Sequence, residues 1–248
     1  MSAEAVRASL ILPTWPAPAW VHACSTTRVG GLSQAPYDSF NLAQHVGDDV
    51  ACVSGNRQRL MQAAGLPQAP QWLTQIHGKR VVALDSEVQR EADSSYTSSP
   101  HTVCAVMTAD CLPILLCHRR QPLVAAIHAG WRGLAEGVIE ATLARFAVDA
   151  AELMAWLGPA IGSDAFEVGE DVYQALATDA LSAVCFKPQR PRHWLADLYA
   201  LARLRLRGLG VEDIYGGEFC TYREGERFFS YRRDGVCGRM ASLIWIAD

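Results

Sequence analysis

Three side chains that can bind a metal each lie beside an apolar run of the sequence: His77 in TQIHG, Cys111 in MTADCLP and His128 in AIHAGWRG. A neutral imidazole and a thiolate suit zinc, and the metal itself would deprotonate the cysteine. Three such ligands with no fourth beside them are what an open zinc site requires, because the vacant position must take water or substrate. The pattern therefore indicates an enzyme.

Two other interpretations of the same three residues stay open at this level. Cys111 could be the nucleophile of a metal-free hydrolase in which one of the histidines acts as the base. Alternatively, the residues are a buried cysteine and two hydrogen-bonded histidines at strand ends, which is the commoner situation for an arbitrary cysteine or histidine.

The elements that must position these residues are short apolar strands and amphipathic helices. WLTQIHG is expected to be a strand that ends at a glycine turn, and TVCAVMTAD and PLVAAIHA are expected to be further strands. GWRGLAEGVIEATLARFAV has the apolar spacing of a helix, which would place His128 just before a helix N-terminus. The polar segment from Ser86 to His101 is expected to be a mobile loop.

Further helices and strands complete the pattern. A helix is expected from about Asp49 to Ala64, with Asp48 as its N-cap and Gly65 as a stop signal. Two more helices are expected in about 170–177 and in ADLYALARLRLRGLGV, and IYGGEFCTY, RFFSYRRDG and ASLIWIAD resemble closing strands. The mixture predicts an α+β fold, with one mixed β-sheet covered by helices.

The bulk properties predict one domain over residues 1–248, in which residues 1–20 are an N-terminal extension or edge segment. A net charge of −4 and dispersed Lys and Arg residues give no general attraction to nucleic acid or to an anionic membrane. The eight cysteines show no disulfide framework, which favours a reducing cytoplasm. The N-terminus is expected to be neither a secretory signal nor a membrane span.

A series of longer motifs runs from about Cys24 to Trp245: STTRVGGLS, SFNL, HVGDD, WLTQIHG, TADCLPILL, AIHAGWRGL, LGPAIG, FEVG, CTY and FSYRRDGVCGRMASLIW. Their order and spacing closely resemble the YfiH family, which is also called the laccase-domain, multicopper polyphenol oxidase or peptidoglycan-editing factor family. The resemblance covers nearly the whole chain.

This resemblance implies a cytoplasmic, usually monomeric zinc enzyme with a layered fold like that of cysteine hydrolases. It assigns the metal to His77, Cys111 and His128, the same residues that the local chemistry selects. Family members are described as zinc-dependent purine nucleoside phosphorylases with adenosine deaminase activity, acting on adenosine, inosine, guanosine or methylthioadenosine.

Two alternative activities belong to the same family. One is a peptidoglycan-editing amidohydrolase that removes L-Ser from UDP-MurNAc-L-Ser, a nucleotide-sugar substrate. The other is a laccase-like polyphenol oxidase, which ranks third because the seven histidines of this chain are too few and too scattered for a multicopper cluster. Outside the enzymes, a module with a structural zinc that binds a partner protein would require a fourth protein ligand.

Several further residues are candidates for catalysis or substrate binding. Asp110 is the first candidate for the proton shuttle of deamination, with a turn or cap as its alternative role. Phosphorolysis needs cations around the phosphate. The candidates are Arg132 and Arg232 as catalytic residues, and Arg28 and Arg233 as substrate-binding residues. The alternative role of each arginine is a surface ion pair. Asn41 and His45 would contact substrate or fix turns.

One segment departs from the family pattern. ADSSYT at 92–97 replaces an apolar ADALVT-like segment, keeping Asp93 and Thr97. This segment is expected to lie in a loop that precedes the metal-binding half of the chain. The change is therefore expected to affect how a substrate base is covered, and not the metal site.

Overall fold

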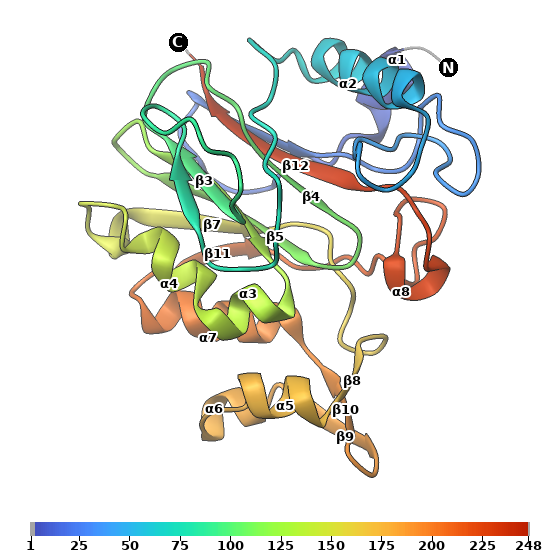
Figure 1. Cartoon of the computed structure of the whole chain (residues 1–248). Coiled ribbons are helices and arrows are strands. Elements are labelled where there is room, and N and C mark those ends of the chain that lie inside the picture. The colour runs from blue at the N-terminus through green and yellow to red at the C-terminus, as the bar shows by residue number, and fades with distance from the viewer. Residues whose placement is uncertain (1–2, 248) are drawn as a thin grey trace.

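The computed structural model describes residues 3–247 as two stacked β-sheets between two layers of helices (Figure 1). The larger sheet has the order β11-β7-β5-β6-β3-β2, and only its outermost pairs, β11 with β7 and β3 with β2, are parallel. Its strands are β2 (Val81–Ala83), β3 (Ser94–Thr97), β5 (Leu112–His118), β6 (Val124–Ala129), β7 (Leu153–Leu157) and β11 (Asp213–Gly216). The smaller sheet has the order β1-β12-β4, with β1 (Val21–Ser25), β12 (Met240–Ile246) and β4 (Cys104–Thr108) all antiparallel.

Each sheet face is covered by a separate apolar cluster. Leu115 and Met154 of the larger sheet pack against Val106 and Ile244 of the smaller one, which forms the layer between the sheets. The outer face of the smaller sheet packs against α1 (Ala3–Ser9) and α2 (Val50–Ala64). The outer face of the larger sheet packs against α3 (Trp131–Glu136), α4 (Val138–Leu143) and α7 (Leu198–Gly208). Because β5 and β6 are covered on both faces, their sequences are continuous apolar runs and not alternating ones.

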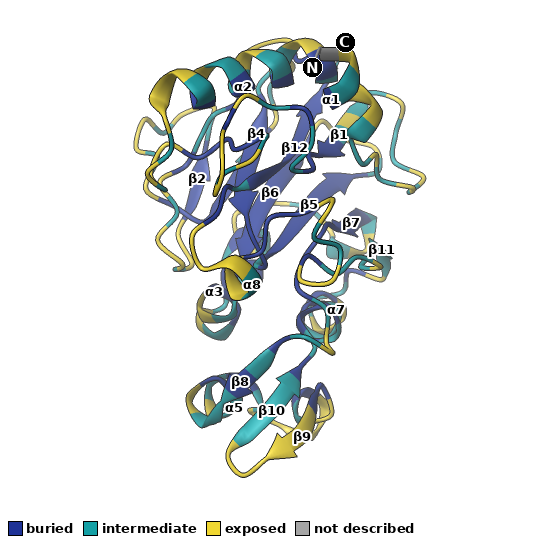
Figure 2. Cartoon of the chain, turned by 90° about the vertical axis from the view of Figure 1, so that its right-hand side faces the viewer, coloured by how far each residue is buried: buried dark blue, intermediate teal, exposed yellow. Residues whose placement is uncertain are grey.

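A small projection extends from one end of the sandwich, as Figures 1 and 2 show. It consists of the antiparallel sheet β8-β10-β9 and the helices α5 (Glu170–Leu176) and α6 (Ala180–Ala183). The strands are β8 (Glu167–Gly169), β9 (Phe186–Arg190) and β10 (His193–Ala196). Its apolar residues continue the core beneath α7, so the projection belongs to the same domain. The remaining short elements are a 3₁₀ turn at Ala150–Glu152 and α8 (Tyr231–Asp234).

The predicted α+β class is confirmed, with two large sheets where a single one was expected. The domain bounds at residues 1 and 248 and the N-terminal extension at 1–20 stay predictions, and residues 1, 2 and 248 lie outside the described part. Within residues 3–247 there is no helix long and apolar enough to cross a membrane.

Two helix predictions need correction in detail. The helix α2 is capped by the side chain of Asp49, which accepts hydrogen bonds from the N–H groups of Ala51 and Cys52, and not by Asp48. The predicted helix after His128 is two helices, because Gly137 adopts a left-handed conformation (φ 88°) that ends α3 and begins α4.

Three predictions about strands and loops are wrong. WLTQIHG is an irregular segment with an isolated bridge at Thr74, and RFFSYRRDG is a loop at 227–230 followed by the short helix α8. The supposed mobile loop at 86–101 contains β3, which lies inside the larger sheet. The polar residues of ADSSYT are therefore buried in a strand, and they do not form a loop over the substrate. Ser94, for example, accepts a hydrogen bond from the Thr142 hydroxyl at 2.8 Å.

The buried side chain of Asn56 in α2 helps to hold the loop between β1 and α2. Its Oδ1 accepts a hydrogen bond from the N–H of Leu32 at 2.8 Å, and its Nδ2 donates to the carbonyls of Asn41 and Ser39 at 2.8 and 3.2 Å. These contacts fix the loop that leads to the site described below.

We expect Asn56→Ala to lower the free energy of unfolding by about 2–4 kcal/mol, because it leaves buried backbone groups without partners. Urea denaturation measures the change, and Gln58→Ala on the exposed side of the same helix is the matched control, with an expected change within about 0.5 kcal/mol. Equal losses in the two variants would contradict the proposed role of Asn56.

Candidate metal centre and its pocket

The three predicted ligands meet at one end of the central strands. Cys111 lies in the turn between β4 and β5, and His128 lies in β6, where it pairs with Pro113. His77 enters from the irregular segment before β2, in a left-handed backbone conformation (φ 61°). The ligand atoms of all three lie within 4.8 Å of one another. The structure thus brings together residues that are far apart in the sequence.

A buried carboxylate, that of Asp93, holds two of these ligands. Its oxygens accept hydrogen bonds from the backbone N–H groups of His77 and Gly78 at 2.9 and 2.8 Å and from the N–H of Ile76 at 3.2 Å. Its Oδ1 also lies 2.8 Å from Nδ1 of His128. With Nδ1 engaged, the His128 ring presents Nε2 to the cluster, as metal-binding histidines held by a carboxylate commonly do.

Gly130 leaves the space that the cluster needs. A Cβ atom at this position would lie 2.9 Å from Sγ of Cys111 and 3.4 Å from Cδ2 of His77. Its backbone angles are ordinary, with φ −68° and ψ 163°, so the requirement for glycine is steric and not conformational. Gly130, at the start of α3, therefore allows Cys111 and His77 to lie close to the helix.

The donor set fits a metal ion with an open position. Tetrahedral bonds of about 2.0–2.3 Å to zinc imply ligand atoms roughly 3.5 Å apart, so a modest side-chain rotation would close the observed cluster on one ion. Within residues 3–247 the cluster contains three ligands, and no fourth His, Cys, Asp or Glu belongs to it. A closed structural site would need that fourth protein ligand. This arrangement favours a site that binds a metal and leaves one position for a small molecule.

The charges within the cluster favour a thiolate. Burial by itself would raise the pKa of Cys111, but the positive charge of His128 and hydrogen bonds from both histidines lower it to about 6. Burial by itself would lower the pKa of His128, but the Cys111 charge and the hydrogen bond to Asp93 raise it to about 9. Without a metal the two residues form a thiolate–imidazolium pair, and a metal ion would take the place of the shared proton.

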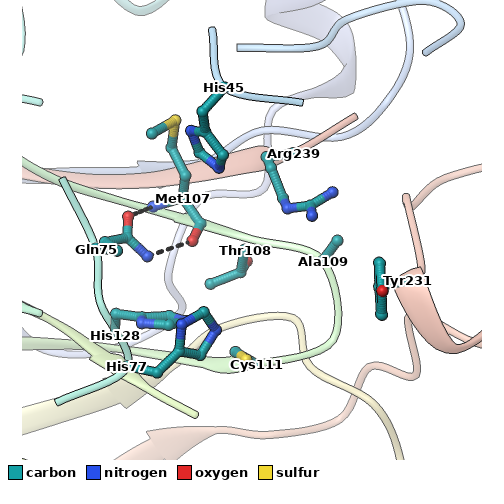
Figure 3. Close-up of a pocket in the computed structure, with 10 residues that line it drawn as sticks. All are labelled: His45, Gln75, His77, Met107, Thr108, Ala109, Cys111, His128, Tyr231 and Arg239. Atoms are coloured by element: carbon teal, nitrogen blue, oxygen red, sulfur yellow. Dashed lines mark hydrogen bonds between the residues drawn. The ribbon is translucent and has the colours of Figure 1, made fainter. Parts of the chain in front are cut away.

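A pocket of about 340 Å³ opens directly on the cluster (Figure 3). This volume lies within the range of about 300–1,000 Å³ that is usual for small-molecule sites. Besides the three ligands, its wall is formed by His45, Gln75, Met107, Thr108, Ala109, Tyr231 and Arg239. The pocket combines one metal-binding wall with an apolar and a cationic part.

Most of these wall residues were missed by sequence reasoning. Arg239 and Tyr231 come from the C-terminal end of the chain, and only the fold brings them to the ligands. Gln75 forms two hydrogen bonds with the backbone of Met107, at 2.7 and 2.8 Å, and so attaches the His77 segment to β4. Asp93 was noted in the sequence as a retained residue but was not assigned to the site, because nothing local indicates that its carboxylate is buried.

The predicted proton shuttle, Asp110, lies beside Cys111 but outside the pocket wall. Its carboxylate accepts hydrogen bonds from the Thr221 hydroxyl at 2.6 Å and from the N–H of Arg232 at 2.7 Å. Its backbone is in a left-handed conformation with φ 91°. Asp110 therefore attaches the 220–232 segment to the turn that carries a metal ligand, while its proposed part in proton transfer stays a prediction.

The four predicted phosphate-binding arginines also lie outside the pocket wall. Arg28 bonds the carbonyl and carboxylate of Asp38, and the exposed Arg132 stacks on Trp131 at 4.3 Å. Arg232 donates to the carbonyl of Glu167 at 2.7 Å. The guanidinium of Arg233 is occupied by backbone carbonyls, those of Thr221, Tyr222 and Phe228. These contacts place each arginine in the framework around the pocket.

The two candidates of the early loop are placed differently. His45 lines the pocket. Burial, followed by the charges of Arg239, Arg57 and His77, lowers its pKa, so the imidazole is mainly neutral at pH 7. Asn41 is fully buried and fixes the turn through the N–H and carbonyl of Ala43.

Comparison with known proteins identifies one family and similar proteins that cover nearly the whole chain. The family model described as "Multi-copper polyphenol oxidoreductase laccase" matches residues 22–247. A protein of Escherichia coli (strain K12) named "Purine nucleoside phosphorylase YfiH" is 55% identical over 240 residues, which is 96% of this chain and 98% of the relative. A Pseudomonas aeruginosa protein that is also named a purine nucleoside phosphorylase is 51% identical, with 96% and 98% covered.

A solved structure has nearly the same fold. The Neisseria meningitidis protein NMB0706 superimposes with a TM-score of 0.92 at 50% identity, over 97% of this chain and 100% of that one. YlmD from Geobacillus stearothermophilus follows with a TM-score of 0.86 at 30% identity and 93% of each chain covered.

We expect Asp93→Asn to weaken metal binding by about 10- to 100-fold, because the His128 ring and the His77 turn lose their shared carboxylate. Titration with a competing chelator measures the affinity. Asp85→Asn is the control, since Asp85 lies near β3 and accepts hydrogen bonds from Thr97 and Ser98 away from the cluster. An affinity unchanged in Asp93→Asn would contradict the argument.

In the metal-free protein, we expect Cys111 to react with iodoacetamide at a rate that rises with pH and is half-maximal near pH 6. The thiolate is the reactive form, and it appears as the pH rises through a pKa of about 6. Cys24, Cys104 and Cys117 are the internal controls, because burial raises each pKa to about 12 and they should stay unmodified at pH 7. Peptide mass spectrometry resolves the sites, and a midpoint above pH 8 at Cys111 would show that the thiol is not activated.

Proposed function

Because the chain belongs to the family described as multi-copper polyphenol oxidoreductase laccase, the YfiH family of the sequence analysis, we propose that it is a zinc-dependent purine nucleoside phosphorylase. The observation that carries the proposal is a three-ligand cluster that faces a pocket of about 340 Å³ and is not closed by a fourth ligand. Relatives that are 55% and 51% identical bear the name purine nucleoside phosphorylase, which supports this substrate class.

Zinc suits the cluster better than copper does. Two imidazoles and one thiolate are ligands that zinc accepts, and three protein ligands with an open fourth position are the plan of a catalytic zinc site. A multicopper centre needs several copper ions, whereas the chain has seven histidines in total and the only candidate cluster in residues 3–247 contains two of them. Zinc, when bound, would polarise a substrate oxygen or activate water without redox chemistry.

The chain's own residues would bind and orient the nucleoside. Tyr231 is 60% exposed on the pocket wall, and its ring, which lies 5.8 Å from the Arg239 guanidinium, would supply aromatic surface for a purine base. Met107 adds apolar surface, and the Thr108 hydroxyl can hydrogen-bond to the sugar or base. Asp93, through His128, would keep the metal wall rigid, so that the glycosidic bond is held in one place relative to the attacking phosphate.

Adenosine deamination is a second activity that the same site would support. It needs an activated water molecule in place of phosphate, and the open position beside Cys111 is suited to supply one. Proton transfer from Asp110 would require its carboxylate to exchange the hydrogen bond from Thr221, which is 2.6 Å long, for one to substrate. Phosphorolysis, which is named in the relatives, is therefore the primary proposal.

The test is incubation of adenosine with the purified, zinc-loaded protein, with and without phosphate, followed by chromatography of the products. We expect adenine and ribose 1-phosphate only when phosphate is present. Cys111→Ala should reduce the rate by about 100-fold or more, because the metal loses a charged ligand. Cys52→Ala is the matched control, since that thiol lies on α2 outside the pocket.

Three other results would change the assignment. Phosphate-independent formation of inosine that is lost in Cys111→Ala would identify the protein as a deaminase. Turnover that persists fully in Cys111→Ala would show that it comes from a contaminant. Absence of turnover with adenosine, inosine, guanosine and methylthioadenosine would reject the nucleoside assignment, and UDP-MurNAc-L-Ser would be the next substrate to assay.

A further inference from the structure

The pocket has a cationic wall that the metal site does not use. Figure 3 shows His45 and Arg239 on the side away from His77, Cys111 and His128. Arg57 of α2 does not line the pocket: its guanidinium lies 4.2 Å from the centroid of the Trp72 ring, and its Nε donates to the carbonyl of Leu42 at 2.9 Å. His45 and Arg239 come from the early loop and the segment before β12.

The positive charge of this wall has no carboxylate partner. In the part of the chain that the structure describes, neither Arg57 nor Arg239 forms an ion pair. By contrast, Arg28 pairs with Asp38 and Arg233 pairs with Asp234. An unpaired guanidinium at a concave surface, as Arg239 has in this pocket, attracts anions, and the planar fork of arginine matches the oxygens of phosphate.

Arg239 is held so that part of its fork stays available. Its Nη1 donates to the carbonyls of Cys237 and Gly238 at 2.8 and 3.0 Å. Among residues 3–247, no hydrogen bond involves its Nε or Nη2. One edge of the guanidinium is therefore anchored, and the other donors are free for a ligand.

The Asn41 side chain fixes the backbone of Arg239, and so connects the early loop to the segment before β12. Oδ1 of Asn41 accepts a hydrogen bond from the N–H of Arg239 at 2.9 Å and another from the N–H of Ala43 at 3.0 Å. The chain can approach this closely because position 238 is glycine: a Cβ there would lie 2.6 Å from the Phe229 ring and 2.8 Å from Cβ of Asn41. Asn41 thus positions both Arg239 and the loop that carries His45.

We propose that Arg239, with His45 beside it, forms the subsite for inorganic phosphate, on the wall opposite the metal ligands. The identity of the anion rests on the proposed function, since phosphorolysis requires phosphate next to the nucleoside. The subsite replaces the four arginines predicted from the sequence, none of which lines the pocket. A neutral imidazole at His45 can donate one N–H to a phosphate oxygen.

The direct test is equilibrium dialysis of the zinc-loaded protein with radiolabelled inorganic phosphate, without nucleoside. Arg239→Gln should weaken phosphate binding by about 10- to 100-fold, because it removes charged donors. Arg239→Lys keeps the charge but loses the planar guanidinium, and its phosphate affinity should lie between those of the unchanged protein and Arg239→Gln. If Arg239→Gln does not fold, Arg239→Lys still tests the subsite. Arg207→Gln, at an exposed position on α7, is the matched control and should bind phosphate normally.

A kinetic measurement separates binding from structural effects. We expect Arg239→Gln to raise the KM for phosphate by about 10-fold or more while the KM for adenosine changes less than about 2-fold. A purely structural role would raise both values. Phosphate binding that depends on Arg239, but without phosphorolysis of any nucleoside, would retain the subsite and reject the proposed function.

Two results would overturn the subsite. If phosphate binding is lost in Cys111→Ala and retained in Arg239→Gln, the anion is bound by the metal. If adenosine 5′-monophosphate binds through Arg239 but free phosphate does not, the wall recognises the phosphate of a larger substrate and not the attacking phosphate.

Discussion

The buried carboxylate of Asp93 is the constraint on which the site depends. An isolated charge in this fully buried position would cost several kcal/mol, so it requires partners on every side. Burial by itself would raise its pKa, but the hydrogen bond and charge of His128 and the N–H groups of Gly78 and His77 lower it. The same contacts fix the turn at His77 and the ring of His128. The geometry of the candidate metal site therefore follows from satisfying one buried charge.

The double-sheet sandwich explains why such a charge can be held rigidly. β3, which carries the chain from Asp93 into the larger sheet, lies beside β6, and the N–H of His128 donates to the carbonyl of Asp93 at 2.7 Å. Strands covered on both faces leave little freedom for the ligand-bearing ends. Close packing also sets a limit, because a side chain at Gly130 would meet Sγ of Cys111 at 2.9 Å. Metal binding and core packing are thus parts of the same structure.

The sequence was sufficient for the α+β class, most helices, the long apolar strands and the choice of His77, Cys111 and His128, which the fold brings into one cluster, because local periodicity and chemically distinctive residues indicate them. It failed for β3, whose polar SSYT resembles a loop: Ser94 is stabilised by a tertiary partner, Thr142, that no local pattern reveals. The arginines predicted to bind phosphate were selected by motif, whereas the role of an arginine depends on its neighbours in the fold. Arg233 is occupied by backbone carbonyls, and Arg239 became visible only when the fold placed it in the pocket.

The two walls of the pocket differ in origin and in charge. The metal wall comes from the central strands, and the thiolate of Cys111 with the carboxylate of Asp93 would offset the two charges of a zinc ion. The other wall joins an early loop to the start of β12 through Asn41, and its arginine, Arg239, has no acidic partner within residues 3–247. A neutral nucleoside and an anionic phosphate would therefore be drawn to different walls. Because Asn41 and Gly238 fix the backbone at Arg239, the distance between the two walls is set by close packing around that backbone.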